Sequence, residues 1–549
     1  MKQRSDHPFV MLVRHFFGRF FDTESLSPQG DPQANFTQTL GILAVPSAFF
    51  ILVCRPLGLW GWSLVGVRYI FLSISMILMG FIMVFEWNAL FPDRRDYQIL
   101  TPLPLRLSAL FLAKAIALGA FLGIFLVDVN FFGVLFWGGI DRGRNIFNLI
   151  GAHVVAMLAG GLFAALAIAA LQGVLITILP GKAYRRVSVT LQTLLMSALV
   201  MLLFLTPLMG FGIEGLAKAR SPLAYWFPGF WFIGLYERQR PATHDQFLLG
   251  LGSFAIRGLW CAAGLFVLTF LPFYRRHARK MLETPEPSPA GSGRLAAWAG
   301  SAVERRLLKH PIESAVFHFI SQTITRSVKH RLFLATYGGF GAALAVMTWR
   351  SGESGLLRLP LTLSFVLVSG LRAAFNFPSE LGANWAFQLT ETSRVQEYLA
   401  ATRKWILLCA ILPLFALLAP MEFACFRWTA ALFHLAYGIA LSVLLMEIMF
   451  FDFRKVPFTC AHLPGKVNLV GLSVVYILGF TMYSRTMADL ETWLAATPVP
   501  AVLYFGCAAL ACVALNGWRH RWFAGEAGAA ILDYEDPGDP VVRTLGITQ

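Results

Sequence analysis

Charged residues are scarce in this sequence. They make up 14% of the 549 residues, whereas hydrophobic residues make up 57%, and soluble domains contain about 25% charged residues. A soluble chain with so few charges would expose large apolar patches and aggregate. The composition therefore excludes an ordinary soluble protein. It predicts an all-α integral membrane protein that crosses the lipid many times.

Motifs for catalysis and cofactor binding are also missing. Gly181-Lys182 and Gly465-Lys466 lack the upstream glycine of a phosphate loop, and neither is followed by Ser or Thr. The sequence contains no H-E-x-x-H or G-x-S-x-G motif, and its seven cysteines form no C-x-x-C pair. We therefore expect that the chain is not an enzyme, has no catalytic residues, and binds neither a cofactor nor a metal.

Apolar runs of about 20 residues predict twelve transmembrane helices. The expected spans are 37–59, 64–85, 107–127, 149–179, 187–212, 247–272, 331–348, 357–376, 404–420, 425–450, 467–484 and 498–517. The stretch 128–139 either extends the third span or lies in the membrane interface. The run 149–179 is long enough for a kink or interruption near Gly160-Gly161.

The basic residues are distributed as this span count requires. Cytoplasmic loops are enriched in Lys and Arg. With both termini inside, 30 of the 45 basic residues fall in inner segments, 11 fall in outer loops and four fall within spans. This pattern predicts a multi-pass protein of the cell (inner) membrane with cytoplasmic termini. Attraction to anionic lipid headgroups explains the net charge of +15 better than a nucleic-acid partner does.

The expected spans form two halves of six, 37–273 and 331–518. The first half follows an amphipathic segment, 1–36, and the second is followed by a cytoplasmic tail, 519–549. Between the halves lies an inner linker, 274–330, which contains the Pro- and Ser-rich sequence ETPEPSPAGSG. An even number of spans gives both halves the same orientation, as in parallel internal repeats. The motif Leu-Pro-Gly-Lys precedes both the fifth and the eleventh spans.

The first inner loop carries the most informative pattern. An acidic residue, an apolar pair, Leu-Pro, Ser and Ala-Lys follow one another at Asp96, Ile99-Leu100, Leu103-Pro104, Ser108 and Ala113-Lys114. This pattern resembles ABC-2 type transporter permeases, and most closely their large bacterial members. In that family a short inner helix in this loop docks on a separate ATPase.

The resemblance implies the membrane permease of an ATP-driven exporter, working as a homodimer or as a self-contained pseudo-dimer. ATP hydrolysis would belong to a partner chain. The residues expected to contact the ATPase are Asp93, Arg94, Arg95, Asp96, Leu103 and Pro104, with Glu391 and Arg394 in the matching loop of the second half.

An aromatic segment lies between the fifth and sixth spans. Tyr225, Trp226 and Trp231 resemble the outer-gate helices of the same family, and an ordinary aromatic belt at the membrane interface is the alternative. The second half has only a short loop, 485–497, where this segment is expected.

Ionisable residues within spans are functional candidates. Arg257 lies near the middle of a span and requires a partner or water, whereas Asp128 lies at the outer end of the third span, where it could be interfacial. Glu86 and Glu447 lie near inner span ends and are expected to snorkel or to pair with Arg94 or Arg454. The single histidines His153 and His434 are expected to be packing residues.

Two other functions remain open at this stage, an ion-coupled secondary carrier and a non-transporting scaffold or assembly factor. The carrier is disfavoured because the expected spans contain few carboxylates. The apolar bundle favours a lipidic or amphipathic cargo over ions.

Overall fold

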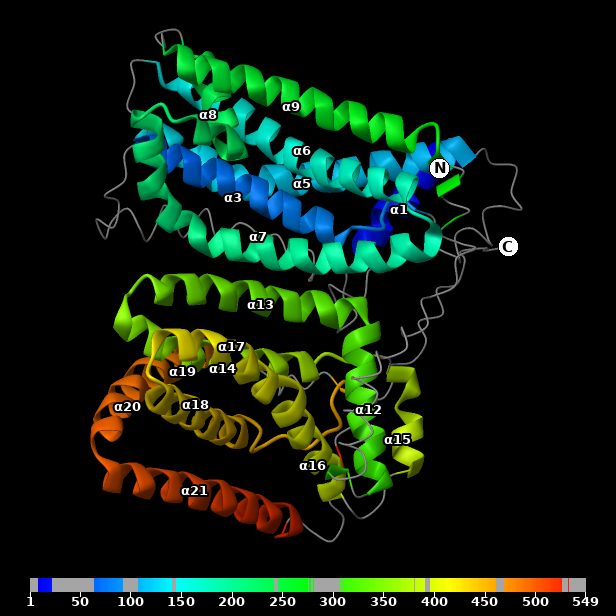
Figure 1. The fold of residues 1–549 in the computed structure, drawn as a ribbon. Coiled ribbons are helices and arrows are strands. Elements are labelled where there is room, and N and C mark those ends of the chain that lie inside the picture. The colour runs from blue at the N-terminus through cyan, green and yellow to red at the C-terminus, as the bar shows by residue number, and fades with distance from the viewer. Residues whose placement is uncertain are drawn as a thin grey trace, which may run out of the picture. The chain divides into compact units, whose positions relative to one another are not determined.

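The computed structural model describes residues 8–21, 64–91, 107–140, 145–240, 245–274, 276–277, 280, 307–308, 310–379, 381–390, 395–460, 469–525 and 532. Every regular element in these ranges is helical (Figure 1). Ten of the helices are long and apolar enough to cross a membrane. The all-α, multi-pass class is therefore confirmed. The first expected span, 37–59, lies outside the described residues, and the eleventh, 467–484, is not among the ten. The count of twelve therefore stays a prediction.

The chain divides into two compact units, residues 1–288 and 289–549. In unit 1 the elements are α1 (Pro8–Phe21), α3 (Leu64–Phe85), α5 (Leu107–Ile140), α6 (Ile146–Ile178), α7 (Gly181–Lys218), the 3₁₀ turn η2 (Pro222–Trp226), α8 (Pro228–Arg238) and α9 (Gln246–Phe270).

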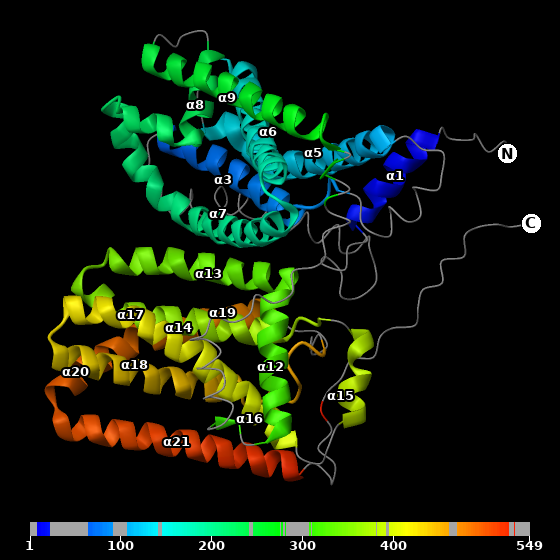
Figure 2. The same cartoon turned by 45° about the vertical axis from the view of Figure 1, so that its right-hand side comes forward.

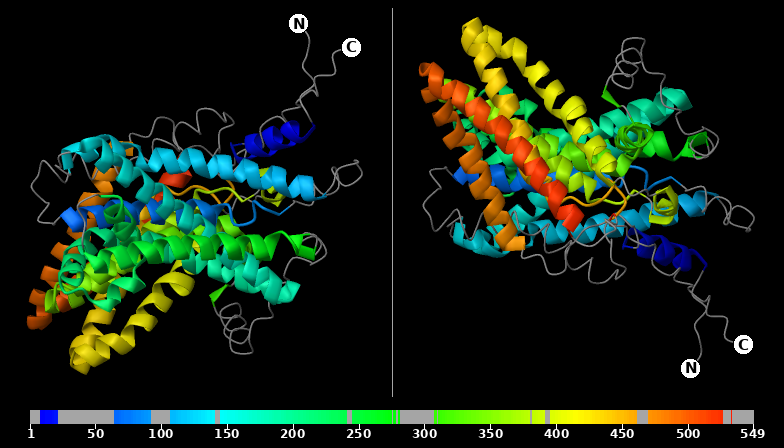
Figure 3. Two further views of the ribbon diagram at one scale, coloured as in Figure 1. Left: turned by 90° about the horizontal axis from the view of Figure 1, so that it is seen from above. Right: turned by 90° about the horizontal axis from the view of Figure 1, so that it is seen from below.

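Helix α3 forms the centre of unit 1. Most of its side chains are buried, because α5, α6, α7 and α8 all pack against it. Figure 3 looks along the vertical axis of Figure 1 and shows α3 between α5 and α7. The amphipathic α1 packs on α5, where the rings of Phe20 and Phe121 stack with centroids 5.0 Å apart.

Two local expectations are resolved in unit 1. Helix α5 runs on to Ile140, so the stretch 128–139 extends the third span. Helix α6 is continuous through Gly160-Gly161, so an interruption there is wrong, whereas a kink stays a prediction. The glycines serve packing instead, because a Cβ atom at Gly160 would lie 3.3 Å from Cγ of Met76.

Unit 2 has more numerous and shorter elements. They are α12 (Pro311–Arg326), α13 (Val328–Trp349), α14 (Glu353–Phe375), the 3₁₀ turn η3 (Leu381–Ala383), α15 (Trp385–Thr390), α16 (Val395–Ile406), the π-turn η4 (Leu407–Ile411), α17 (Leu412–Cys425), α18 (Trp428–Met449), α19 (Leu469–Thr481), the π-turn η5 (Met482–Thr486), α20 (Met487–Ala496) and α21 (Pro498–Gly525).

The two π-turns join consecutive helices in unit 2 without a break. Residues 395–425 form one helical run, and residues 469–496 form another. The loop expected at 485–497 is therefore wrong, because α20 occupies these residues. Helix α12 packs on α16 and lies across the ends of the long helices rather than along them (Figure 2).

Candidate functional site

The residues expected to contact an ATPase all fall outside the described part of the chain. Asp93, Arg94, Arg95, Asp96, Leu103 and Pro104 belong to 92–106, and Glu391 and Arg394 belong to 391–394. The structure does describe the two ends of the first of these segments, at residues 91 and 107. These ends show how the segment is anchored to the membrane helices.

The turn that follows α3 is anchored by side chains from α6 and α7. The buried indole of Trp87 donates a hydrogen bond to Oγ of Ser188, 2.7 Å away, and Gln172 donates to the carbonyl of Trp87. Gln192 donates to the carbonyl of Val84 at 2.9 Å. The last carbonyls of a helix have no partner within the helix. Here amide side chains of neighbouring spans satisfy them and fix the turn in place.

Lys114 connects the two ends of the segment 92–106. Lys114 is only 5% exposed. Its ammonium group donates a hydrogen bond to the carbonyl of Phe91 at 2.8 Å and lies 4.9 Å from the ring centre of Phe16 on α1. Tyr274 donates to the neighbouring carbonyl of Leu90 at 3.2 Å. The start of the segment 92–106 is therefore tied to α5 through Lys114 and to Tyr274, next to Phe16 of α1.

Glu86 is the first residue after α3, at the start of this turn. Burial raises the pKa of its carboxyl group from the ordinary value of 4.5 to about 7. The anchored turn therefore carries an acid that titrates near neutral pH. It is the one acidic group of the turn 86–91.

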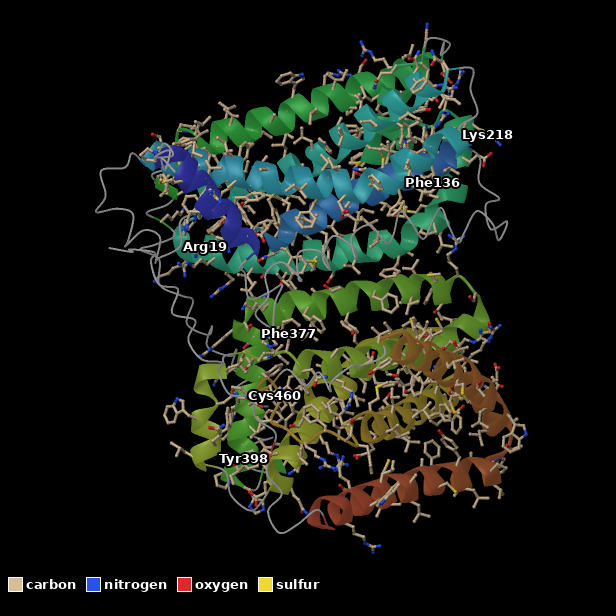
Figure 4. All side chains as sticks on the ribbon, turned by 180° about the vertical axis from the view of Figure 1, so that it is seen from behind. Arg19, Phe136, Lys218, Phe377, Tyr398 and Cys460 are labelled. Atoms are coloured by element: carbon tan, nitrogen blue, oxygen red, sulfur yellow. The ribbon has the colours of Figure 1, made fainter. Side chains whose placement is uncertain are left out.

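The corresponding turn of unit 2 is held in a different way. Residues after α14 bond to residues after α18: the amide of Ser379 donates to the carbonyl of Phe458 at 2.9 Å, and that of Phe458 donates to Phe375 at 3.1 Å. Arg372 donates to the carbonyl of Met449 and pairs with Asp452 at 2.8 Å. Figure 4 shows Phe377, Cys460 and Tyr398 at this one end of unit 2.

Of the three expected gate aromatics, the structure brings two together. The indole of Trp231 donates to the carbonyl of Tyr225 at 2.9 Å, and both rings pack edge-on against Phe254. Trp226, by contrast, is 83% exposed. The segment lies at the end of unit 1 marked by Phe136 and Lys218 in Figure 4, opposite Arg19.

A buried ion pair holds α8 against the centre of unit 1. Arg68 of α3 and Glu237 of α8 are both buried and form a direct ion pair. Arg240 contacts the same carboxylate at 3.3 Å, and the Arg68 guanidinium lies 4.5 Å from the ring centre of Tyr236. The span count placed Arg68 within a span but gave no indication of its partner, because 169 residues separate the two.

An aromatic stack borders this ion pair. Trp137 of α5 stacks on His153 of α6 with ring centroids 3.6 Å apart, and its indole donates to the Tyr236 hydroxyl at 3.3 Å. His153 is thus part of a polar and aromatic cluster that joins α5, α6 and α8. The expectation of a packing residue describes only part of this arrangement.

The two other intramembrane candidates of the first half are not brought together. Arg257 is exposed on its unit, where Nε donates to the carbonyl of Ser253 at 3.3 Å and the guanidinium lies 5.0 Å from the ring centre of Phe254. It does not face the interior of unit 1. Asp128 lies well inside α5 rather than at its end. Its Oδ2 is buried without a hydrogen-bond partner in the described residues.

Unit 2 contains a buried charged cluster that sequence reasoning missed. His434 of α18 contacts Glu491 of α20 through Nδ1 and lies 3.5 Å from Oε1 of Glu422 of α17 through Nε2. Glu422 falls between two expected spans and Glu491 falls in the expected loop. Neither was therefore counted as intramembrane.

Glu447 has partners other than the expected ones. It is buried and pairs with Arg403 of α16 and, at 3.2 Å, with Arg519 of α21. The described residues thus hold five buried carboxylates in or beside spans that are paired with cations or histidine: Glu237, Glu313, Glu422, Glu447 and Glu491. This is more than the sequence indicated.

No family model matches the sequence, and neither a curated protein nor a solved structure matches it.

Proposed function

We propose that this chain is the membrane permease of an ATP-driven exporter of the ABC-2 type, powered by an ATPase on a separate chain. The observation that carries the proposal is the anchoring of the turn 86–91. A partner that pushes on the segment 92–106 would act on Phe91 and, through Lys114, Trp87 and Gln172, on α5, α7 and α6. Such a connection suits a loop that transmits force to spans.

The architecture we propose has twelve spans in two parallel halves, in the inner membrane, with both termini cytoplasmic. Similar contacts within each unit support it. An amphipathic helix packs on the helix at the third expected span of each half, α1 on α5 and α12 on α16. A short helix near the end of each half contacts three long ones, α8 with α3, α6 and α9, and α20 with α14, α18 and α21.

We propose a lipidic or amphipathic cargo. An apolar cavity of about 210 Å³ lies in unit 1 between α3, α5, α6 and α9. The side chains that line it are all apolar and include Met79, Leu118, Leu162 and Phe266, with Gly119 and Gly123 beside them. A space of this kind suits a hydrocarbon chain and offers no groups to coordinate an ion.

The test is purification of the tagged chain from its native membrane in mild detergent, with and without crosslinking, followed by mass spectrometry. We expect a stoichiometric ATPase that carries a phosphate loop. Reversing the charges of Asp93, Arg94, Arg95 and Asp96 should abolish its recovery, because surface charges guide soluble partners to their docking sites.

The matched control exchanges Glu214 and Lys218, an ion pair of 2.6 Å in which the lysine is exposed and the glutamate half-buried, at the end of unit 1 away from Arg19. This exchange reverses two charges and should leave the ATPase bound. Recovery of the intact chain without an ATPase under both conditions would contradict the proposal. Transport that persists without an ATPase and follows an ion gradient would instead identify a secondary carrier.

A further inference from the structure

The cluster of Glu422, His434 and Glu491 is almost completely removed from solvent. The three residues are 0%, 2% and 2% exposed, and they come from three different helices, α17, α18 and α20. One imidazole faces two carboxyl groups, with Nδ1 bonded to Glu491 and Nε2 3.5 Å from Glu422. Even a fully protonated imidazole can neutralise only one of two carboxylates.

Glu422 is the group whose charge is left unbalanced. Neither of its carboxyl oxygens has a hydrogen-bond partner among the described residues. An ionised carboxylate that lacks both a bonded cation and hydrogen bonds is strongly disfavoured in a low-dielectric interior. A neutral carboxylic acid at the same position avoids most of that cost.

Among the described residues of unit 2, the groups packed around the cluster supply no second cation. On α14, Arg358 pairs at 3.6 Å with Asp489, whose side chain is largely exposed. Arg427 precedes α18 and Arg485 lies in the π-turn before α20, and both are exposed. The remaining titratable neighbours are three tyrosines. Tyr437 of α18 donates a hydrogen bond to the carbonyl of Met487 at 2.8 Å, and Tyr504 of α21 stacks on Tyr437. The hydroxyl of Tyr483, in the π-turn, lies 3.1 Å from the hydroxyl of Ser364.

We propose that Glu422, His434 and Glu491 form a buried proton-binding site, in which Glu422 carries the bound proton at neutral pH and whose occupancy controls how firmly α20 is held. The ligand is a proton, exchanged between a Glu422 oxygen and water with no other bond formed or broken. The proposal goes beyond the exporter function, since it concerns unit 2 alone and needs no ATPase.

The link to α20 follows from where Glu491 lies. His434 bonds to Glu491 on α20 and faces Glu422 on the other side of its ring. When Glu422 loses its proton, its negative charge draws the imidazolium toward α17 and repels Glu491. The contact between α18 and α20 is then weakened, and the remaining bonds from Tyr437 and Arg358 must hold α20.

Infrared difference spectroscopy of the purified full-length chain tests the proposal. At pH 7 the wild type should show the carbonyl stretch of a neutral carboxylic acid, and labelling with [¹³C]glutamate should shift it. Glu422→Gln should remove the intensity of one carboxyl group. Asp489→Asn, which removes an exposed carboxyl group of α20, should retain it. The [¹³C] shift is also measured in Glu86→Gln, because Glu86 titrates near pH 7 as well. A neutral glutamic acid that remains there is not Glu86, and its detection does not depend on the folding of Glu422→Gln.

Hydrogen exchange of the α20 amides tests the second part. Between pH 6 and pH 9, after correction for intrinsic rates, exchange in 487–496 should become about tenfold faster in the wild type and should change little in Glu422→Gln.

Three results of the infrared experiment would overturn the proposal. They are the absence of a neutral glutamic acid at pH 7, a band of full intensity in Glu422→Gln, and a band that appears only when sodium is withdrawn. The last result would mark a sodium site instead.

Discussion

Gly234 of α8 and Gly252 of α9 touch backbone to backbone. A Cβ atom on Gly252 would lie 2.6 Å from the carbonyl oxygen of Gly234, and one on Gly234 would lie 2.5 Å from the carbonyl oxygen of Leu248. Real Cβ atoms do not approach so closely, and a backbone atom cannot move aside as a flexible side chain does. The short helix and the last span of unit 1 are therefore joined at a crossing that only glycine permits.

Alanine at either position should separate the two helices. We expect Gly234→Ala or Gly252→Ala to lower the free energy of unfolding by about 1–3 kcal/mol, the usual cost of overpacking. Gly264→Ala is the control on the same helix, because a Cβ there meets nothing within 4 Å. It should be neutral or slightly stabilising, since alanine favours helix. Thermal unfolding in detergent measures all three, and equal effects would refute the close crossing.

Removing one partner of the buried pair Arg68–Glu237 should destabilise the protein. Glu237→Gln leaves the Arg68 charge in a low-dielectric interior, and we expect a loss of about 3 kcal/mol. The double variant Arg68→Met, Glu237→Gln should recover at least half of this loss, because no unpaired charge then remains at position 68. A double-mutant cycle by denaturant titration measures the coupling. Additive single effects would mean that the pair is not coupled in solution.

The Lys114 ammonium group should hold both ends of the segment 92–106. Lys114→Met keeps the apolar stem but removes the bond to Phe91, and we expect a loss of about 2 kcal/mol, typical of a hydrogen bond made by a charged group. Limited trypsin cleavage at Arg94 and Arg95 should also become faster. Lys218→Met, which alters an exposed lysine, is the control. Unchanged cleavage in Lys114→Met would show that the tether is dispensable.

Glu86 should make stability fall as the pH rises. Its folded pKa of about 7 lies above the ordinary value of 4.5, so between these values the folded state binds more protons than the unfolded state. Stability contributed by the neutral acid is therefore complete below about pH 4.5 and is lost by about pH 7. Glu86→Gln should be more stable than the wild type by about 2 kcal/mol at pH 8 and equal to it at pH 4. Melting curves across this range decide the sign.

Long apolar runs were enough to locate most spans, because a helix that must cross about 30 Å of hydrocarbon needs about 20 apolar residues. The same reasoning placed Glu422 and Glu491 between spans, since a carboxylate lowers the mean hydropathy of any window that contains it. Their burial depends on His434 from another helix, and hydropathy contains no information about such partners.

The gate aromatics show the same limit at a smaller scale. Tyr225, Trp226 and Trp231 are equivalent by residue type and lie close together in sequence. Only the turn from η2 into α8 decides that Trp231 bonds to Tyr225 while Trp226 points outward. Residue type predicted an aromatic cluster, and backbone geometry determined its members.

The π-turns at 407–411 and 482–486 make unit 2 sensitive to the length of its chain. Each adds one residue to an otherwise α-helical run, and each residue of an α-helix turns the next by about 100°. Deleting one residue from 407–411 would leave a regular α-helix, but it would rotate Glu422 away from His434. A deletion in 482–486 would do the same to Glu491. Helical phase, rather than residue identity alone, is thus what a related sequence would have to preserve.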